Sequence, residues 1–200
     1  RVTRESLFVR PQRFYENAGV AVRLGVLVSR VDTERRSVTT KAGEKVEYEK
    51  LLLATGCTAR TLDVPGNTLP NIFTLRTLAC ADRLKSALRT AKTAVIVGGS
   101  FIGMELAAAC AQSGIRTTLL HRGKEIFEKL GSTEASAFFS QTFAERGVTI
   151  RTEDEALAFE PTPRSSAVTV QTRRGDTLRA DMVAVGVGVV PETSYLAGSG

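Results

Sequence analysis

The sequence has few of the residues that build metal centres, disulfide frameworks or nucleic-acid interfaces. Its 200 residues include one histidine and three cysteines, with no C-x-x-C pair or other zinc-type spacing. We therefore expect no metal site, and the small cysteine set favours a reducing compartment, either cytoplasm or mitochondrion. The formal net charge is +6, but no basic patch is interleaved with aromatic residues, so nucleic acid is not an expected partner.

Long apolar runs and targeting signals are also lacking. No hydrophobic stretch approaches the length of a membrane span, and the N-terminus has no secretory pattern. The chain begins with Arg1 rather than methionine, which suggests an internal piece or a processed product of a longer protein. The sequence leaves the oligomeric state open.

The most informative segment is an apolar strand that leads through a glycine turn into a helix. Residues 93–97 are rich in β-branched side chains, residues 101–113 favour a helix, and residues 115–120 read as a second strand. The dinucleotide-binding template G-x-G-x-x-G has this context, and Gly98, Ser100 and Gly103 occupy its three key positions.

Serine departs from the template at the middle position, where glycine normally lets the backbone approach a pyrophosphate. The Ser100 side chain is small, and its hydroxyl could donate to a phosphate. Free N–H groups and the positive end of the helix dipole favour an anion at such a turn. The segment therefore predicts NAD(P)H binding, with a purely structural glycine turn as the alternative.

The elements around this turn predict an α/β fold. From about residue 92 the chain reads as a Rossmann-like βαβαβ unit with a parallel sheet, followed by a β-meander and a buried strand at 182–185. The helices of this part are 101–113 and 132–146, and the meander strands are 156–160, 167–172 and 177–179. Earlier elements are a helix at 8–19, strands at 20–24, 26–31, 37–40, 45–48 and 51–56, and a helix at 78–90.

Four segments occur in an order that resembles a known family. They are Tyr48-Glu49-Lys50-Leu51-Leu52-Leu53-Ala54-Thr55-Gly56, Val64-Pro65-Gly66, residues 97–105, and Val185-Gly186-Val187-Gly188-Val189-Val190-Pro191-Glu192-Thr193. Together they resemble the FAD-dependent pyridine nucleotide-disulfide oxidoreductase superfamily, and within it the ferredoxin-reductase and apoptosis-inducing-factor-like branch. The resemblance covers nearly the whole chain.

The resemblance implies a division into domains. Residues 1–90 would be part of an FAD-binding domain, with a β-meander, the strand that ends at Ala54-Thr55-Gly56, and a linker helix. Residues 91–190 would form the NAD(P)H-binding Rossmann-like domain, and residues 191–200 would begin the return to the FAD domain.

The resemblance also implies cofactor contacts. On the FAD side they are Leu27 and Val28 near the adenine, then Ala54, Thr55, Gly56 and Arg60. At the NAD(P)H pyrophosphate they are Gly98, Gly99, Ser100, Phe101, Ile102 and Gly103. Glu105 would lie at the nicotinamide end as the candidate catalytic residue, and Gly186 and Gly188 would pass under the nicotinamide half. The alternatives are that Glu105 is an acid in the first helical turn and that Gly186 and Gly188 are strand-end turns.

The end of the second predicted strand bears on the choice of nicotinamide. NAD-preferring sites place an acid about 20 residues past the first glycine, to bind the ribose 2′-hydroxyl. Here that place holds His121, Arg122 and Lys124, and the next acid, Glu125, comes later. Because cations suit a 2′-phosphate, the cluster favours NADPH over NADH, although Arg122 and Lys124 can also be read as exposed loop residues. His121 lies at the adenosine end, so we expect no catalytic role for it.

The resemblance implies an FAD-dependent NAD(P)H oxidoreductase. Its electrons would pass through the flavin to an iron–sulfur protein, a quinone or another acceptor. No two cysteines have the C-x4-C spacing of the disulfide-using relatives. The alternatives are a non-catalytic nucleotide-sensing module and a signalling role of the apoptosis-inducing-factor kind.

Overall fold

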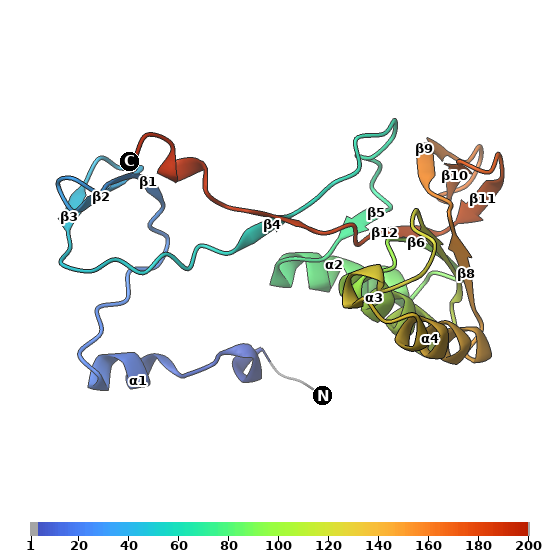
Figure 1. The fold of residues 1–200 in the computed structure, drawn as a ribbon, viewed down its shortest axis with the longest axis horizontal. Helices are drawn as coiled ribbons and strands as arrows, with labels where there is room; N and C mark the ends of the chain where they lie inside the picture. Colours follow the sequence, from blue (N-terminus) through green and yellow to red (C-terminus); the bar gives the residue numbers. More distant parts are fainter. Residues whose placement is uncertain (1–3, 200) are drawn as a thin grey trace. The chain divides into compact units, whose positions relative to one another are not determined.

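The computed structural model describes residues 4–199, and the chain divides into two compact units (Figure 1). The first unit comprises residues 1–55 and 192–200, and the second comprises residues 56–191. The cofactor domains expected at residues 1–90, 91–190 and 191–200 remain a prediction.

The second unit is built on a five-stranded parallel sheet. In chain order its strands are β5 (Ile72–Thr74), β6 (Thr93–Val97), β7 (Arg116–His121), β8 (Val148–Thr152) and β12 (Met182–Val185). Their order across the sheet is β5-β12-β6-β7-β8, and all neighbouring strands are parallel. The carboxyl ends of β6, β7 and β12 therefore meet at one edge, which is where open α/β sheets bind ligands.

Three helices pack on one face of this sheet. They are α2 (Leu78–Leu88), α3 (Phe101–Gln112) and α4 (Thr133–Glu145). Alternate strand residues such as Ile96 and Leu119 point to this face and pack with Met104 and Ala107 of α3 in one core. Thr77 and Ser132 cap α2 and α4, because each side chain accepts a hydrogen bond from a first-turn amide.

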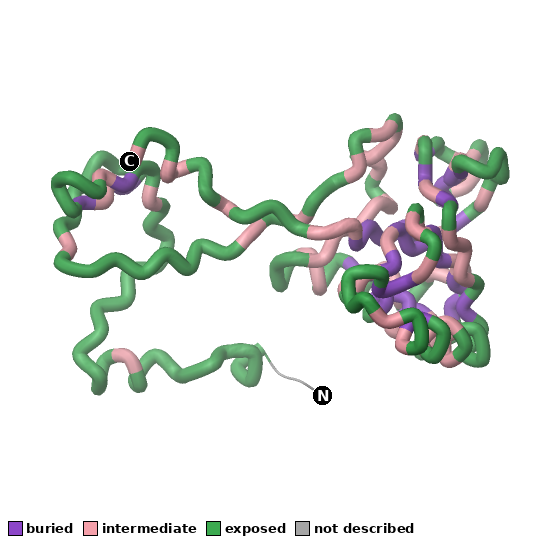
Figure 2. Tube along the Cα trace, viewed as in Figure 1, coloured by how far each residue is buried: buried purple, intermediate pink, exposed green. Residues whose placement is uncertain are grey.

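A three-stranded antiparallel meander covers the other face. Its strands are β9 (Ala156–Pro161), β10 (Val168–Thr172) and β11 (Thr177–Ala180). Phe159 and Val170 pack there with Val95 and Val183 of the parallel sheet. Figure 2 shows buried residues concentrated in the strands of this unit. The predicted class, a Rossmann-like α/β fold with a parallel sheet and a β-meander, is confirmed.

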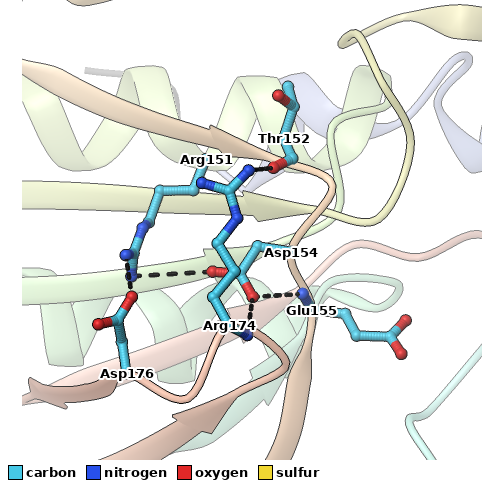
Figure 3. Close-up of polar contacts among 6 residues, drawn as sticks. All are labelled: Arg151, Thr152, Asp154, Glu155, Arg174 and Asp176. Atoms are coloured by element: carbon cyan, nitrogen blue, oxygen red, sulfur yellow. Dashed lines mark hydrogen bonds and ion pairs between the residues drawn. The ribbon is translucent and has the colours of Figure 1, made fainter.

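A buried carboxylate ties the meander to the end of β8 (Figure 3). Asp154 is fully buried, and its Oδ1 accepts hydrogen bonds from the amides of Glu155 at 3.0 Å and Arg174 at 3.2 Å. The Arg151 guanidinium lies 3.8 Å from Asp154 Oδ2 and also pairs with Asp176. This network holds the turn between β10 and β11 against the sheet edge that carries the predicted site.

The first unit contains a three-stranded antiparallel sheet and short helices. The strands are β1 (Val28–Asp32), β2 (Ser37–Thr40) and β3 (Lys45–Glu47), and the helices are η1 (Glu5–Leu7), α1 (Gln12–Asn17) and η3 (Ser194–Leu196). Val31 is the one buried hydrophobic side chain among the described residues of this unit. The remaining elements lie in the second unit: η2 (Glu128–Leu130), and β4 (Cys57–Ala59) paired antiparallel with β13 (Val189–Pro191).

Two predicted strands are wrong. Residues 20–24 and 51–56 have no regular structure, and Leu24 and Leu52 are largely exposed. A strand needs a neighbour for its backbone hydrogen bonds, and no strand within residues 4–199 pairs with either segment. The helix predicted at 8–19 is shorter and spans Gln12–Asn17. The short strands β4 and β5 were not predicted from the sequence.

Candidate functional site

The glycine turn lies between β6 and α3, as the sequence predicts. The strand ends at Val97, Ser100 is the N-cap residue of α3, and the helix begins at Phe101. The Gly98 amide donates to the carbonyl of Leu120 at 2.9 Å, which fixes the start of the turn against β7. The turn therefore opens at the carboxyl edge of the parallel sheet.

Three glycines interlock at this edge through their backbones. Gly98 has φ of 115°, and a Cβ built on it would lie 2.8 Å from the carbonyl carbon of Gly186. A Cβ on Gly103 would lie 2.8 Å from the carbonyl carbon of Gly98, and one on Gly186 would lie 2.8 Å from the Gly103 nitrogen. Real Cβ atoms essentially never approach this closely, so all three positions require glycine for the backbones to meet.

The first turn of α3 presents its amides at this point. The N–H groups of Phe101, Ile102 and Gly103 belong to the helical first turn, which has no intrahelical partners for them. The Ser100 side chain does not cap the helix, because its hydroxyl donates to the Gly186 carbonyl at 3.3 Å. The Ser100 hydroxyl, a candidate donor to a phosphate, thus contacts Gly186 in this structure. The cradle of free amides at a 12-residue helix fits a pyrophosphate.

Gly99 is held on both sides of the turn. Its amide donates to Nδ1 of His121 at 3.2 Å, and its carbonyl accepts from the Phe127 amide at 2.8 Å. A Cβ on Gly99 would lie 2.8 Å from Cγ of His121 and 2.9 Å from Cγ2 of Ile126. The loop after β7 and the glycine turn are therefore packed together with no space for a larger residue at position 99.

The cationic cluster begins at the carboxyl end of β7. His121 is the last residue of the strand and is partly buried, while Arg122 and Lys124 are exposed. Burial lowers the pKa of His121, and the charge of Arg122 lowers it further, whereas Glu128 and the backbone of Glu125 raise it.

Glu128 was missed from the sequence. Its carboxylate accepts a hydrogen bond from the Lys124 amide at 3.1 Å, and a Cβ on Gly123 would lie 2.6 Å from both of its carboxylate oxygens. An acid therefore does fold back to the strand end that appeared purely cationic. The glycine at position 123, which permits this approach, was the one available signal.

Two further residues expected near the nicotinamide are Glu105 and Gly188. Glu105 is exposed at the fifth position of α3, and the first turn of this helix contains no acid. Its interpretation as a first-turn acid is therefore wrong.

Gly188 has φ of 116°, and its carbonyl accepts from the amide of Arg60 at 3.0 Å. The structure thus brings together two of the residues singled out from the sequence, Arg60 and Gly188.

The FAD-side residues fall in both units and are described within each. In the first unit, Val28 starts β1, and the carbonyl of Leu27 accepts from the Lys41 amide at 2.7 Å. In the same unit, Ala54 precedes Thr55, whose hydroxyl donates to the Glu192 carbonyl at 3.0 Å and lies 2.9 Å from the Tyr195 hydroxyl.

Arg76 is a second residue that sequence reasoning missed. It belongs to the second unit, where Gly56 has φ of 72° and a Cβ on it would lie 2.8 Å from Nη2 of Arg76. Nε of Arg76 donates to the Cys57 carbonyl at 2.6 Å. The Arg76 guanidinium lies so close to Gly56 that a side chain at position 56 would collide with it, which explains why a glycine is favoured there.

Within residues 4–199, no group of three or more histidine, cysteine or acidic side chains is placed to hold a metal ion. None of the helices there is long and apolar enough to cross a membrane. Cys57, Cys80 and Cys110 are all free thiols.

Comparison with known proteins identifies the family. The model of the pyridine nucleotide-disulphide oxidoreductase family matches residues 4–200, so the chain belongs to this family. The ferredoxin reductase subunit of 5,5'-dehydrodivanillate O-demethylase from Sphingobium sp. is 34% identical over 192 residues, which cover 96% of this chain and 47% of that protein. Rhodocoxin reductase from Rhodococcus erythropolis is 34% identical over 197 residues, covering 98% of this chain and 46% of that protein.

A solved structure gives the same result. The crystal structure of the covalent putidaredoxin reductase–putidaredoxin complex superimposes with a TM-score of 0.91 and 30% identity, covering 100% of this chain and 49% of the matched chain. The chain thus spans about half the length of the curated relatives it matches.

Proposed function

We propose that this chain is the nucleotide-handling part of an FAD-dependent NAD(P)H oxidoreductase. The observation that carries the proposal is the interlock of Gly98, Gly103 and Gly186 beside the free first-turn amides of α3. Such a cradle suits the pyrophosphate of NAD(P)H, with the N–H groups of residues 101–103 as donors. Glu105 is then the candidate catalytic residue, since its exposed carboxylate lies one helical turn further along α3.

For the FAD side of the proposal we assign Leu27, Val28, Ala54, Thr55, Gly56 and Arg60. When bound, the flavin supplies the ability to accept a hydride and to release electrons to an acceptor. The protein residues supply backbone amides and the cation of Arg60. Gly56 has a positive φ and no side chain, so its backbone can approach the flavin cofactor closely.

The acceptor we propose is an iron–sulfur protein. One relative is named a ferredoxin reductase subunit and another rhodocoxin reductase, and a similar structure is a complex of putidaredoxin reductase with putidaredoxin. The basic net charge of this chain would also favour an acidic partner. A quinone or another small acceptor is the alternative.

For the nicotinamide we propose NADPH, because Arg122 and Lys124 are exposed at the carboxyl end of β7. Glu128 favours the alternative, NADH. Its exposed carboxylate is held beside Lys124, where it could accept hydrogen bonds from a ribose diol.

The experiment is to purify the full-length protein and to record its visible spectrum before and after anaerobic addition of NADPH or NADH. We expect a flavin spectrum that is bleached by nicotinamide, faster with NADPH. A colourless folded protein that still binds NAD(P)H would instead support a nucleotide-sensing module. A protein that binds neither cofactor would refute the proposal.

A further inference from the structure

His121 connects the glycine turn to the loop that follows β7. Its Nδ1 accepts the hydrogen bond from the Gly99 amide at 3.2 Å, while the Gly99 carbonyl accepts from the Phe127 amide at 2.8 Å. The ring is packed so closely that a Cβ on Gly99 would lie 2.8 Å from its Cγ. The imidazole therefore helps to hold Gly99 in place.

This hydrogen bond determines the protonation state of the ring. A nitrogen accepts only through a free lone pair, so Nδ1 is unprotonated and the neutral ring carries its proton on Nε2. Nε2 is itself buried, and the backbone of Glu125 acts on the ring. A protonated imidazolium would place an N–H on Nδ1 opposite the Gly99 N–H, and two donors cannot form a hydrogen bond.

The charges around the ring act in both directions. From the loop after β7, the cation of Arg122 lowers the pKa of His121, while the carboxylate of Glu128 and the backbone of Glu125 raise it. Burial is the largest effect and lowers it.

The strand that carries His121, β7, pairs with β8, and a network of polar side chains lies at the end of β8. Thr152 is the strand partner of His121, and the amide of Asp154 donates to the His121 carbonyl at 3.1 Å. The carboxylate of Asp154 lies 3.8 Å from the Arg151 guanidinium, which also pairs with Asp176. On this side the Arg151 guanidinium therefore faces both carboxylates, and the acid whose charge raises the pKa of His121 is Glu128.

We infer that His121 is a positioning residue whose neutral imidazole holds the Gly99 peptide in the conformation that receives a pyrophosphate, and whose protonation releases that peptide. The inference rests on the proposed binding of NAD(P)H at the turn. Because the neutral form is competent, affinity is constant above the pKa of His121 and falls as the pH drops below it. An unperturbed histidine has a pKa of about 6.5, and the lowered value places the decline in more acidic solution.

The test measures ADP-ribose binding to the full-length, flavin-loaded protein by calorimetry from pH 4 to pH 8, because the pKa of His121 lies below that of an unperturbed histidine. ADP-ribose carries the pyrophosphate but no nicotinamide, so it does not reduce the flavin. His121→Asn keeps an acceptor in reach of the Gly99 amide but does not titrate. His121→Leu removes the acceptor, and circular dichroism with a melting curve shows whether each variant is folded.

We expect the wild-type Kd to weaken by about tenfold for each pH unit below the pKa of His121, as one linked proton requires. His121→Asn should bind within about threefold of wild type at neutral pH and lose this slope, and His121→Leu should be about tenfold weaker at every pH. Binding by wild type with no pH dependence, or the same slope in His121→Asn, would overturn the inference while leaving the proposed function intact.

A second measurement, by NMR, does not depend on comparing the ligand affinities of variants. Long-range ¹H–¹⁵N spectra of the imidazole, assigned by the signals that disappear in His121→Asn, should show the tautomer protonated on Nε2. Saturation with ADP-ribose should lower the pKa of His121, because linkage is reciprocal. A ring protonated on Nδ1 at neutral pH, or a pKa unchanged by bound ligand, would overturn the inference even if calorimetry showed tight binding.

Discussion

Gly98 and Gly186 approach each other so closely that a Cβ on Gly98 would lie 2.8 Å from the Gly186 carbonyl carbon. Gly186 follows β12 and Gly98 follows β6, so two neighbouring parallel strands leave the sheet in contact. The Gly186 amide donates to the Val97 carbonyl at 2.8 Å, which continues the sheet hydrogen bonding up to the turn. The pyrophosphate cradle proposed here therefore depends on both strands.

Gly98→Ala tests this contact. The methyl group would displace the Gly186 backbone, so we expect NAD(P)H affinity to fall by at least about tenfold, with a loss of stability of about 2 kcal/mol. The measurements are calorimetric Kd and thermal unfolding. The matched control is Gly114→Ala, at a glycine with φ of 74° and no neighbour within 4 Å of its Cβ position. It should cost about 1–2 kcal/mol of backbone strain and leave the Kd unchanged. An unchanged Kd in Gly98→Ala would contradict the proposed cradle.

The loop after β7 should set the choice between NADPH and NADH. The double variant Arg122→Gln/Lys124→Gln should weaken NADPH by about tenfold or more and NADH by much less, because the lost cations face a 2′-phosphate. Steady-state KM and kcat with each nicotinamide provide the measurement. Lys129→Gln, which removes a cation from the nearby η2, is the control and should change neither.

Glu128→Gln gives the opposite test at the same loop. If NADPH is preferred, loss of this carboxylate should leave NADPH unchanged or tighter, because one repulsive charge is removed. Should Glu128→Gln instead weaken NADH about tenfold while the double variant spares NADPH, Glu128 would be the ribose-binding acid and the preference would be for NADH.

Asp181 should contribute to stability in a pH-dependent way. Its Oδ2 accepts from the amides of Lys92 at 2.8 Å and Thr93 at 2.9 Å, and from the Thr93 hydroxyl at 3.0 Å. The Lys92 amide hydrogen bond is the largest cause that lowers the pKa of Asp181 in the folded protein. An unfolded aspartate has a pKa of about 3.9, so this stabilisation is present above about pH 4 and disappears as the pH falls through the lower folded value.

Asp181→Asn should therefore lower the free energy of unfolding by about 1 kcal/mol at neutral pH, allowing for solvent screening. The difference from wild type should shrink below about pH 4, as followed by urea unfolding at several pH values. Asp63→Asn, at an exposed position in a loop of the same unit, controls for the lost charge and should have little effect. Equal effects of the two variants would exclude a special role for Asp181.

The cysteines should differ in reactivity. The Thr77 hydroxyl donates to the Cys80 thiol and lowers its pKa, whereas burial raises the pKa of Cys110 to about 11. Because the thiolate is the nucleophile, iodoacetamide should modify Cys80 well before Cys110 in the folded protein. Thr77→Val should slow the modification of Cys80. Peptide mass spectrometry follows both sites, and equally rapid labelling of Cys110 in folded protein would contradict this order.

The sequence predicted most of the second unit because its local and tertiary signals agree. Residues 93–97 and 182–185 match β6 and β12, and the helix at 101–113 exceeds α3 by one residue. The β-branched strands are buried, and the glycine turn has a distinctive local pattern. Here propensity, periodicity and the need for a buried core all favour the same structure.

The prediction fails where structure depends on a distant partner. Leu51, Leu52 and Leu53 have the composition of a strand, but none of the described strands pairs with them. Glu128 was missed because a loop turns back to bring it against Gly123, and Arg76 was missed because its position depends on its contact with Gly56. Such approaches are made by tertiary packing, and a single sequence gives no periodic signal for them.

The most direct test is a crystal structure of the full-length protein grown with NADPH or NADH. The account predicts that the pyrophosphate lies against the amides of Phe101, Ile102 and Gly103, with the adenosine ribose near Arg122. A dinucleotide bound elsewhere, or a turn without ligand density under conditions where calorimetry shows saturation, would contradict it.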